Sequence, residues 1–173
     1  WLQQEALPLW STAGVDCATG TVWEALDHQG RPCRDMTRRL RVQVRQAYCF
    51  AKAEDPELHR LGLQLFRFAM DRGFAPDTDQ LGAQLAPDAS LLTAPHDLYD
   101  MAFMLLAAAA LLEAGFDVEA DLARLEAGLA RLKAPRGWHE DIARRLPRRQ
   151  NPHMHLFESM TALYRATRAP RFL

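Results

Sequence analysis

The feature that most limits the fold of this chain is a run of twelve apolar residues, Met101–Leu112. A helix needs roughly 20 apolar residues to span a bilayer, so this run is too short for a transmembrane segment. It lies within a helix predicted over His96–Ala114 and makes the centre of that helix apolar on all sides. A helix of this kind is buried by other elements all round. We therefore predict an all-α protein with this segment in its interior.

Five further helices are predicted on either side of this buried segment. Glu57–Arg72 is amphipathic, and Glu119–Lys133 carries a single leucine stripe at helical spacing. Buried and amphipathic helices thus alternate along the chain. This alternation is typical of helical hairpins laid side by side, with one helix of each pair inside. The five predicted helices cover residues 1–12, 36–53, 57–72, 119–133 and 152–167.

Three long loops separate the hairpins, at residues 13–35, 73–95 and 134–151. Each loop joins the end of one hairpin to the start of the next, so we expect all three on the same side of the molecule. Long loops in a compact domain are often functional. Within the first loop, Thr21–Asp27 alternates like a short strand and His28–Arg31 offers a turn, which predicts a small strand there.

The composition narrows the classes of partner. Apolar residues make up 49% of the chain, charged residues 25%, and the formal net charge is −1. A nucleic-acid-binding surface normally leaves a basic excess, so nucleic acid is not predicted as a partner, and neither is a membrane. Three cysteines without a Cys-x-x-Cys pair indicate neither a disulfide framework nor a zinc knuckle, and a reducing cytoplasm is the default compartment. No linker divides the chain, so residues 1–173 are predicted to form a single domain.

Arginines on the second predicted helix form the first candidate site. Arg38, Arg41 and Arg45 fall on one face of a helix with 3.6 residues per turn. For Arg38 and Arg39 the favoured interpretation is a solvated basic face. Arg45 differs, because its neighbours one turn away are Val42, Tyr48 and Cys49. A guanidinium among such residues needs an acceptor, which is either an internal carboxylate or a hydroxyl-rich ligand.

A second candidate lies at the start of the most buried helix. Asp97 and Asp100 are favoured at a helix N-terminus by the helix dipole alone. Tyr99 is more suggestive, because it places an aromatic ring with a polar tip at the entrance to an apolar interior. A third candidate, Gly137–Asp141 in the last long loop, combines polar and aromatic residues of the kind that commonly cap a pocket.

The segment Arg149–Glu158 is predicted to be a loop that runs into a helix. Asn151 is predicted as the N-cap residue, because its side-chain oxygen can accept from free backbone N–H groups of the first turn. Pro152 then takes the first helical position, where a missing N–H costs nothing.

Two histidines follow in the first turn of that helix. His153 and His155 lie about 200° apart around the helix axis, so they cannot share one ion and no metal site is predicted. We expect one of them to face the interior with Glu158 and Ser159. It is either a satisfied core histidine or a group that contacts a ligand by proton transfer or hydrogen bonding.

Taken together, these residues resemble the N-acylglucosamine 2-epimerase family, including its mannose isomerase and phosphomannose isomerase-like branch. The resemblance covers the whole chain, with its motifs in family order. The matching stretches are Leu7–Trp10 with Gly14–Asp16, Gly20–Asp27 with Gly30–Pro32, Arg38–Gln46, Asp97–Phe103, and Asn151–Glu158.

The resemblance implies an (α/α)6 toroid of helical hairpins, of which this chain holds about three, with inner helices around a sugar pocket. It implies Arg45, Tyr99, Asn151 and His155 as substrate-binding residues. It also implies aldose–ketose isomerisation or C2 epimerisation of a mannose- or glucosamine-type sugar. In that chemistry a histidine removes the proton next to the carbonyl and an enediol intermediate forms, with no metal and no nicotinamide cofactor. The implied partner is a small-molecule sugar, and the formation of a homo-oligomer is left open.

Members of this family are about twice as long as this chain, and their catalytic histidine pair belongs to the second half of the barrel. We therefore expect the 173 residues to be the N-terminal half of a barrel and inactive alone. A fragment is favoured over an assembly of halves, because Trp1 is not an initiator methionine. An open half-barrel would expose apolar surface on its inner helices.

Two other functions fit the same pattern of helices. One is an (α/α)6 glycoside hydrolase or lyase, which needs a pair of carboxylates that face the pocket. The other is a half-barrel that binds sugar without turnover. Exchange of the substrate C2 proton with solvent separates an isomerase from both.

Overall fold

The computed structural model describes residues 1–145 and 147–173, and helices dominate this part of the chain. The six predicted helices are confirmed, with boundaries close to those expected from the sequence. A short π-helical turn, Leu2–Ala6, precedes the first α-helix, and a 3-10 turn, Pro170–Phe172, follows the last. The α-helices are α1 (Leu7–Thr12), α2 (Leu40–Ala51), α3 (Pro56–Arg72), α4 (Leu98–Glu113), α5 (Glu119–Ala130) and α6 (Gln150–Thr167).

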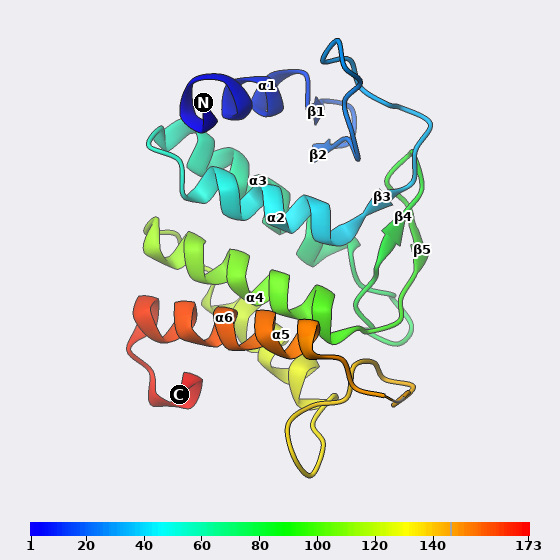
Figure 1. Ribbon diagram of the computed structural model, residues 1–173, viewed down its shortest axis with the longest axis vertical. Coiled ribbons are helices and arrows are strands. Elements are labelled where there is room, and N and C mark those ends of the chain that lie inside the picture. The colour runs from blue at the N-terminus through cyan, green and yellow to red at the C-terminus, as the bar shows by residue number, and fades with distance from the viewer. Residues whose placement is uncertain (146) are drawn as a thin grey trace.

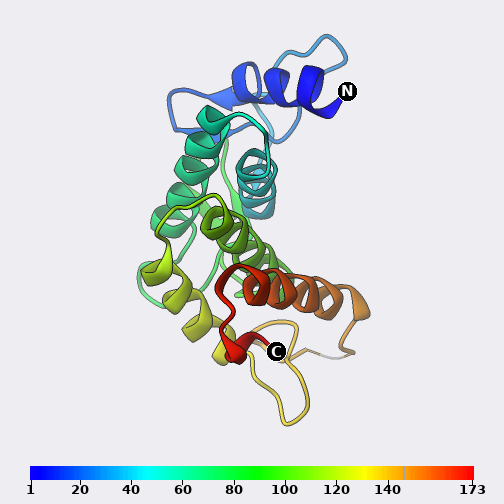
Figure 2. The ribbon, with the colours of Figure 1, turned by 90° about the vertical axis from the view of Figure 1, so that its left-hand side faces the viewer.

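The helices form two layers, as the alternation of buried and amphipathic segments predicts. Helices α2, α4 and α6 lie side by side and run in the same direction, with α4 between the other two (Figure 1). Helix α3 packs against α2, and α5 packs against α4. Figure 2 shows α3 and α5 along the outer side of this arrangement. The result is two helical hairpins, α2–α3 and α4–α5, whose inner helices share one layer with α6.

Helix α4 is the buried helix that the apolar run predicts. All of its residues are buried except Tyr99, Leu112 and Glu113. It begins at Leu98 rather than at His96, because Asp97 is its N-cap and accepts from the backbone N–H groups of Tyr99 and Asp100. No helix in the described part of the chain is both long and apolar enough to cross a membrane.

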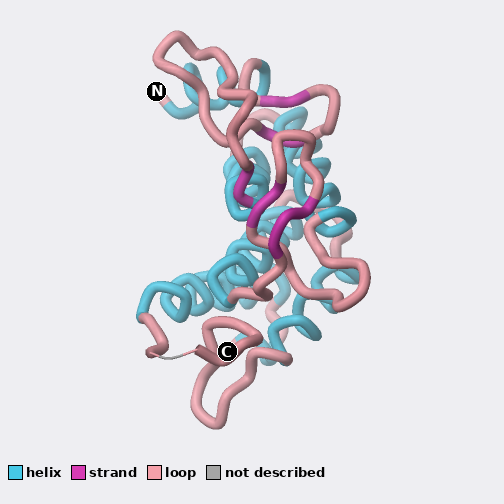
Figure 3. The backbone as a smooth tube through the Cα atoms, turned by 90° about the vertical axis from the view of Figure 1, so that its right-hand side faces the viewer, coloured by secondary structure: helices cyan, strands magenta, loops and turns pink. Residues whose placement is uncertain are grey.

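The first two long loops carry short strands, and all three loops lie at the end of the molecule where α2, α4 and α6 begin (Figure 1). Figure 3 looks onto this end and shows the strands together. The shared side of the three loops is thus confirmed, apart from residue 146 of the third loop, which lies outside the described residues. The strands are β1 (Val15–Asp16), β2 (Thr21–Val22), β3 (Arg38–Arg39), β4 (Gln84–Leu85) and β5 (Leu91–Thr93).

These strands form two small antiparallel sheets, β1–β2 and β3–β4–β5. The strand predicted at Thr21–Asp27 is confirmed only for its first two residues, which pair with β1. Strand β3 pairs with β4 in the second long loop: Arg38 lies opposite Leu85, and Arg39 lies opposite Gln84. The loops are therefore tied to each other at the end where α2 begins.

The prediction of a solvated face at Arg38 is wrong. Arg38 lies in β3, not in the helix, and its side chain is fully buried. Its guanidinium pairs with Asp16 at 2.7 Å, donates to Thr21, and lies 4.1 Å from the centre of the Trp23 ring. These partners offset the cost of burying the charge. Arg39 is exposed, as predicted, and pairs with Glu24.

His96 fastens the second long loop to α5. It is fully buried, with a φ of 49°. Its Nδ1 accepts from the backbone N–H of Leu81 at 3.0 Å, and its Nε2 donates to the carbonyl of Gly128 at 2.8 Å. Both ring nitrogens are satisfied in the neutral form, and burial lowers the pKa of His96 below its usual value.

Helix α6 carries exposed apolar side chains, as expected for the edge of an open barrel. Met154 is 50% exposed and Phe157 is 74% exposed. A groove beside Phe157 runs between α5, α6 and the C-terminal 3-10 turn and is lined by Trp138 and Tyr164.

We predict that His96→Ala lowers the free energy of unfolding by about 2–4 kcal/mol, because it leaves a buried N–H and a buried carbonyl without partners. Because the folded pKa of His96 is lowered, the unfolded state binds more protons as the pH falls below about 6.5. The stability that His96 contributes is therefore lost on acidification. Urea unfolding at several pH values measures both effects. The exposed His28→Ala variant is the control, and equal losses in the two variants would contradict this role.

Candidate functional site

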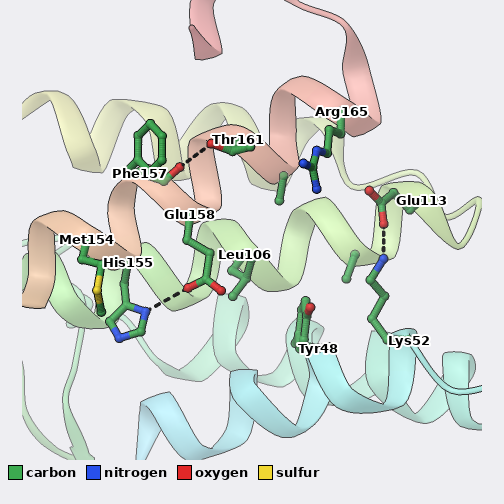
Figure 4. A pocket seen from close by; sticks show the side chains of 12 residues that line it. Tyr48, Lys52, Leu106, Glu113, Met154, His155, Phe157, Glu158, Thr161 and Arg165 are labelled. Carbon is green, nitrogen blue, oxygen red and sulfur yellow. Dashed lines mark hydrogen bonds and ion pairs between the residues drawn. The ribbon is translucent and has the colours of Figure 1, made fainter.

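The three inner helices each present one stripe of side chains to a common groove. The stripes follow the three- and four-residue spacing of a single helix face. The parts of the stripes from Tyr48, Leu106 and His155 onward line a groove of about 570 Å³ (Figure 4), and the stripe residues nearer the helix N-termini lie outside that lining. The stripes are Arg41, Arg45, Tyr48 and Lys52 on α2; Tyr99, Phe103, Leu106, Ala110 and Glu113 on α4; and Asn151, His155, Glu158, Ala162 and Arg165 on α6.

His155 stands where the groove meets the polar residues near the helix N-termini. Its ring packs edge to face on Tyr99, with 5.2 Å between ring centres, and lies 4.7 Å from the ring of Phe103. Its Nδ1 lies 2.9 Å from a carboxylate oxygen of Glu158. The side chain of His155 is 21% exposed, so it is supported by its neighbours and still reachable from the groove.

Arg45, on α2, packs on the same Phe103 ring as His155. Its guanidinium lies 4.9 Å from the centre of the Phe103 ring. Within the described residues no carboxylate pairs with Arg45, so the internal carboxylate allowed by the sequence is not found there. Arg45 is exposed, and its guanidinium N–H groups are available to donate to a ligand.

A buried ion pair between α2 and α4 supports the wall of this site. Arg41 Nε lies 2.7 Å from Asp100 Oδ1, and the Arg41 guanidinium lies 4.8 Å from the centre of the Tyr99 ring. Asp100 is almost completely buried. The pKa of Asp100 is raised to about 7. Burial is the main cause, nearby Asp97 adds to the rise, and Arg41 opposes it. The pair thus fixes Arg41 against Tyr99.

Asn151 is not the N-cap of α6, which corrects the prediction. The helix begins at Gln150, and its N-cap is Arg149, which has no side-chain cap of its own. Glu140 takes the capping role, because its carboxylate accepts from both the backbone N–H and the Nε of Arg149. Asn151 is exposed and lies one turn before His155 on the same helix face. Its amide is therefore not used to start the helix.

The two histidines of α6 point to different surroundings, as their angular separation predicts. His153 lies with Nδ1 3.0 Å from the carbonyl of Arg149 and Nε2 3.0 Å from the carbonyl of Trp138. It thus joins the third long loop to α6. The expected capping of the pocket by Gly137–Asp141 is not seen at His155, because Trp138 lines the separate groove between α5 and α6.

The structure brings together three of the four predicted substrate-binding residues, Arg45, Tyr99 and His155, around the ring of Phe103. The sequence analysis did not single out Phe103 as a site residue, although its position one turn after Tyr99 was the available signal. The Arg41–Asp100 pair was also missed, since its members are 59 residues apart.

Known proteins are similar to this chain in sequence and in fold. Residues 21–173 match the sequence profile of the N-acylglucosamine 2-epimerase (GlcNAc 2-epimerase) family. A mannose-6-phosphate isomerase of Rhizobium meliloti (strain 1021) is 41% identical over 175 residues, which cover 94% of this chain and 44% of that protein.

Solved structures with similar folds include a cellobiose 2-epimerase from Spirochaeta thermophila DSM 6192, with a TM-score of 0.81 and 21% identity. A D-mannose isomerase matches with a TM-score of 0.80 and 16% identity. The chain is covered to 96% in both comparisons, whereas 47% and 45% of those chains are covered. The chain therefore has the fold of these epimerases and spans about half the length of the proteins it matches.

We predict that Asp100→Asn changes how the free energy of unfolding depends on pH. Because the pKa of Asp100 is raised from 3.8 to about 7, the folded state binds the extra proton between these values. The stability contributed by Asp100 is thus greatest at low pH and is lost as the pH rises toward 7. Urea unfolding across this range should show a difference between wild type and Asp100→Asn that varies with pH. If the free energies of unfolding of wild type and Asp100→Asn changed in parallel with pH, this prediction would be contradicted. The control is the exposed Asp77→Asn variant.

Proposed function

Since the chain belongs to the N-acylglucosamine 2-epimerase family, we propose that it forms the sugar-binding wall of a cytoplasmic sugar isomerase or 2-epimerase. The observation that carries the proposal is that Arg45, Tyr99 and His155, from three different helices, all pack on Phe103, and that His155 also lines the open groove. The arrangement combines donors, an acceptor and aromatic faces. Sites that bind small polar ligands use such a small set of placed polar groups on an apolar wall.

The proposed roles follow from the chemistry of each side chain. Arg45 and Asn151 offer N–H groups to the sugar oxygens and to the carbonyl of the ring-opened form. Tyr99 and Phe103 present aromatic surface to the C–H groups of the sugar, and His155 contacts a hydroxyl. In the reaction a base removes the proton at C2, an enediol forms, and a proton returns to C2 or to C1.

We propose that the base which removes the C2 proton lies outside these 173 residues. Of the six histidines in the chain, His155 is the one on the inner stripes. As a base removes the C2 proton, an acid protonates the carbonyl oxygen to form the enediol, so the reaction needs an acid–base group besides His155. The chain also spans about half the length of the isomerases and epimerases that it matches. We therefore propose that Arg45, Tyr99, Asn151 and His155 bind the substrate and that they belong to the N-terminal half of an (α/α)6 barrel.

We propose a mannose-type sugar as the substrate. The names of the relatives support this class, because one is a mannose-6-phosphate isomerase and another is a D-mannose isomerase. Both reactions act at C1 and C2 of the same hexose. Neither name decides whether the substrate of this protein is phosphorylated.

A glycoside hydrolase is the second candidate, because two carboxylates, Glu113 and Glu158, line the groove. Glu113 is paired with Lys52, and Glu158 is bonded to His155. Both carboxylates are thus engaged with a cationic or imidazole partner, whereas glycoside hydrolysis needs a pair of carboxyl groups directed at the scissile bond. In the isomerase proposal, Glu158 supports the substrate-binding His155.

We predict that Arg45→Ala and His155→Ala each weaken binding of D-mannose to this chain by about tenfold or more, because each removes a hydrogen bond to the sugar. Titration calorimetry measures the change. Arg60→Ala, on the outer helix α3, is the matched arginine control and should bind as wild type does. Wild-type affinity in both groove variants would contradict the site.

We further predict that the 173-residue chain puts no deuterium at C2 of D-mannose in deuterated water, because the proposed base is absent. Proton NMR of the recovered sugar is the measurement. Deuterium at C2 that disappears in His155→Ala would show that His155 itself is the base. That result would overturn the placement of the base outside this chain.

A further inference from the structure

The contact between Glu158 and His155 constrains the histidine more than a simple binding role requires. The two residues are one turn apart on α6, and Glu158 Oε2 lies 2.9 Å from His155 Nδ1 (Figure 4). Glu158 makes no other ion pair within the described residues. Its side chain is 55% exposed, so it buries little surface and contributes little to the core.

The charge state of Glu158 decides which nitrogen of His155 carries the proton. A carboxylate can only accept a hydrogen bond, so Nδ1 must donate. A neutral imidazole carries only one N–H. Since that proton is on Nδ1, the other nitrogen, Nε2, has a free lone pair. Glu158 therefore makes Nε2 an acceptor.

The aromatic neighbours fix the direction in which Nε2 points. Tyr99 stands nearly perpendicular to the imidazole, at 82°, and Phe103 packs against it at 42°. With the ring held between them and Glu158 on Nδ1, the second ring nitrogen lies on the side away from Glu158 (Figure 4). No described residue bonds to Nε2, so this position is open to a ligand.

We infer that Glu158 is a positioning residue that holds His155 in the Nδ1–H form, so that Nε2 accepts a hydrogen bond from a sugar hydroxyl. This inference rests on the proposed function for the identity of the ligand, but not for the state of the ring. Arg45, whose guanidinium lies 4.9 Å from the centre of the Phe103 ring, is a separate donor beside the ring on which His155 packs.

His96 provides a reference of the opposite kind within the same chain. The backbone N–H of Leu81 donates to its Nδ1, so His96 must carry its proton on Nε2. Its contacts are the backbone groups of Leu81 and Gly128, which lie outside α6 and make no hydrogen bond with Glu158. One spectrum can therefore report both ring forms and verify that the chain is folded.

The experiment is long-range proton–nitrogen NMR of the ¹⁵N-labelled 173-residue chain at a pH of about 8.5, where histidine is neutral. We expect His155 as Nδ1–H and His96 as Nε2–H in the wild type. In Glu158→Ala the Nδ1–H population of His155 should fall at least twofold, while His96 is unchanged. Glu113→Ala, which removes a carboxylate from the same groove, is the matched control and should leave His155 as in wild type.

Two outcomes overturn the inference: His155 in the Nε2–H form in the wild type, or an unchanged ring form in Glu158→Ala with His96 intact. Addition of D-mannose then tests the proposed function separately. A shift of the His155 Nε2 signal supports a sugar contact at that atom. If His155 is in the Nδ1–H form but its Nε2 signal does not respond to saturating D-mannose, the proposed sugar contact is contradicted. The inference that Glu158 sets the ring form would then still hold.

Discussion

The burial of α4 on nearly every side is the constraint on which the rest of the structure depends. Its centre offers only apolar side chains, so α2 and α6 must cover its flanks and the outer helices its back. The residues that escape burial lie at its ends. Tyr99 is one of them, and the groove begins where it emerges. The same packing that completes the core thereby places one inner face of three helices around a shared space.

Polar groups hold the entrance end of this core in place. Arg38 binds the first loop through Asp16, His96 binds the second loop to α5, and His153 binds the third loop to α6. Arg41 and Asp100 join α2 to α4 directly beside Tyr99. Each contact joins segments that are distant in the sequence. The groove residues are thus carried by helices whose N-termini are fastened to one another through the loops.

The helices could be predicted because their signals are local: the spacing of apolar residues sets both their extent and their buried face. The hairpin order and the common side of the loops followed from the same pattern. The errors have one cause, which is that partners from elsewhere in the chain replaced local ones. Glu140 caps α6 in place of Asn151, and an extended pairing with β4 removed Arg38 from the helix.

The candidate site could be predicted only in part. Arg45, Tyr99 and His155 were identified through the resemblance, and the structure brings them together. Phe103, on which Arg45 and His155 both pack, was concealed within the apolar run that identified the core. The Arg41–Asp100 pair leaves no trace in the sequence, because its two members belong to different hairpins.

The central claim is that the inner faces of α2, α4 and α6 form one sugar-binding surface. Backbone amide shifts of the ¹⁵N-labelled chain during titration with D-mannose test it most directly. The account predicts that the largest shifts fall on residues around Arg45, Tyr99 and His155, with α3 and α5 unaffected. Shifts confined to the groove between α5 and α6, around Trp138 and Tyr164, would contradict it.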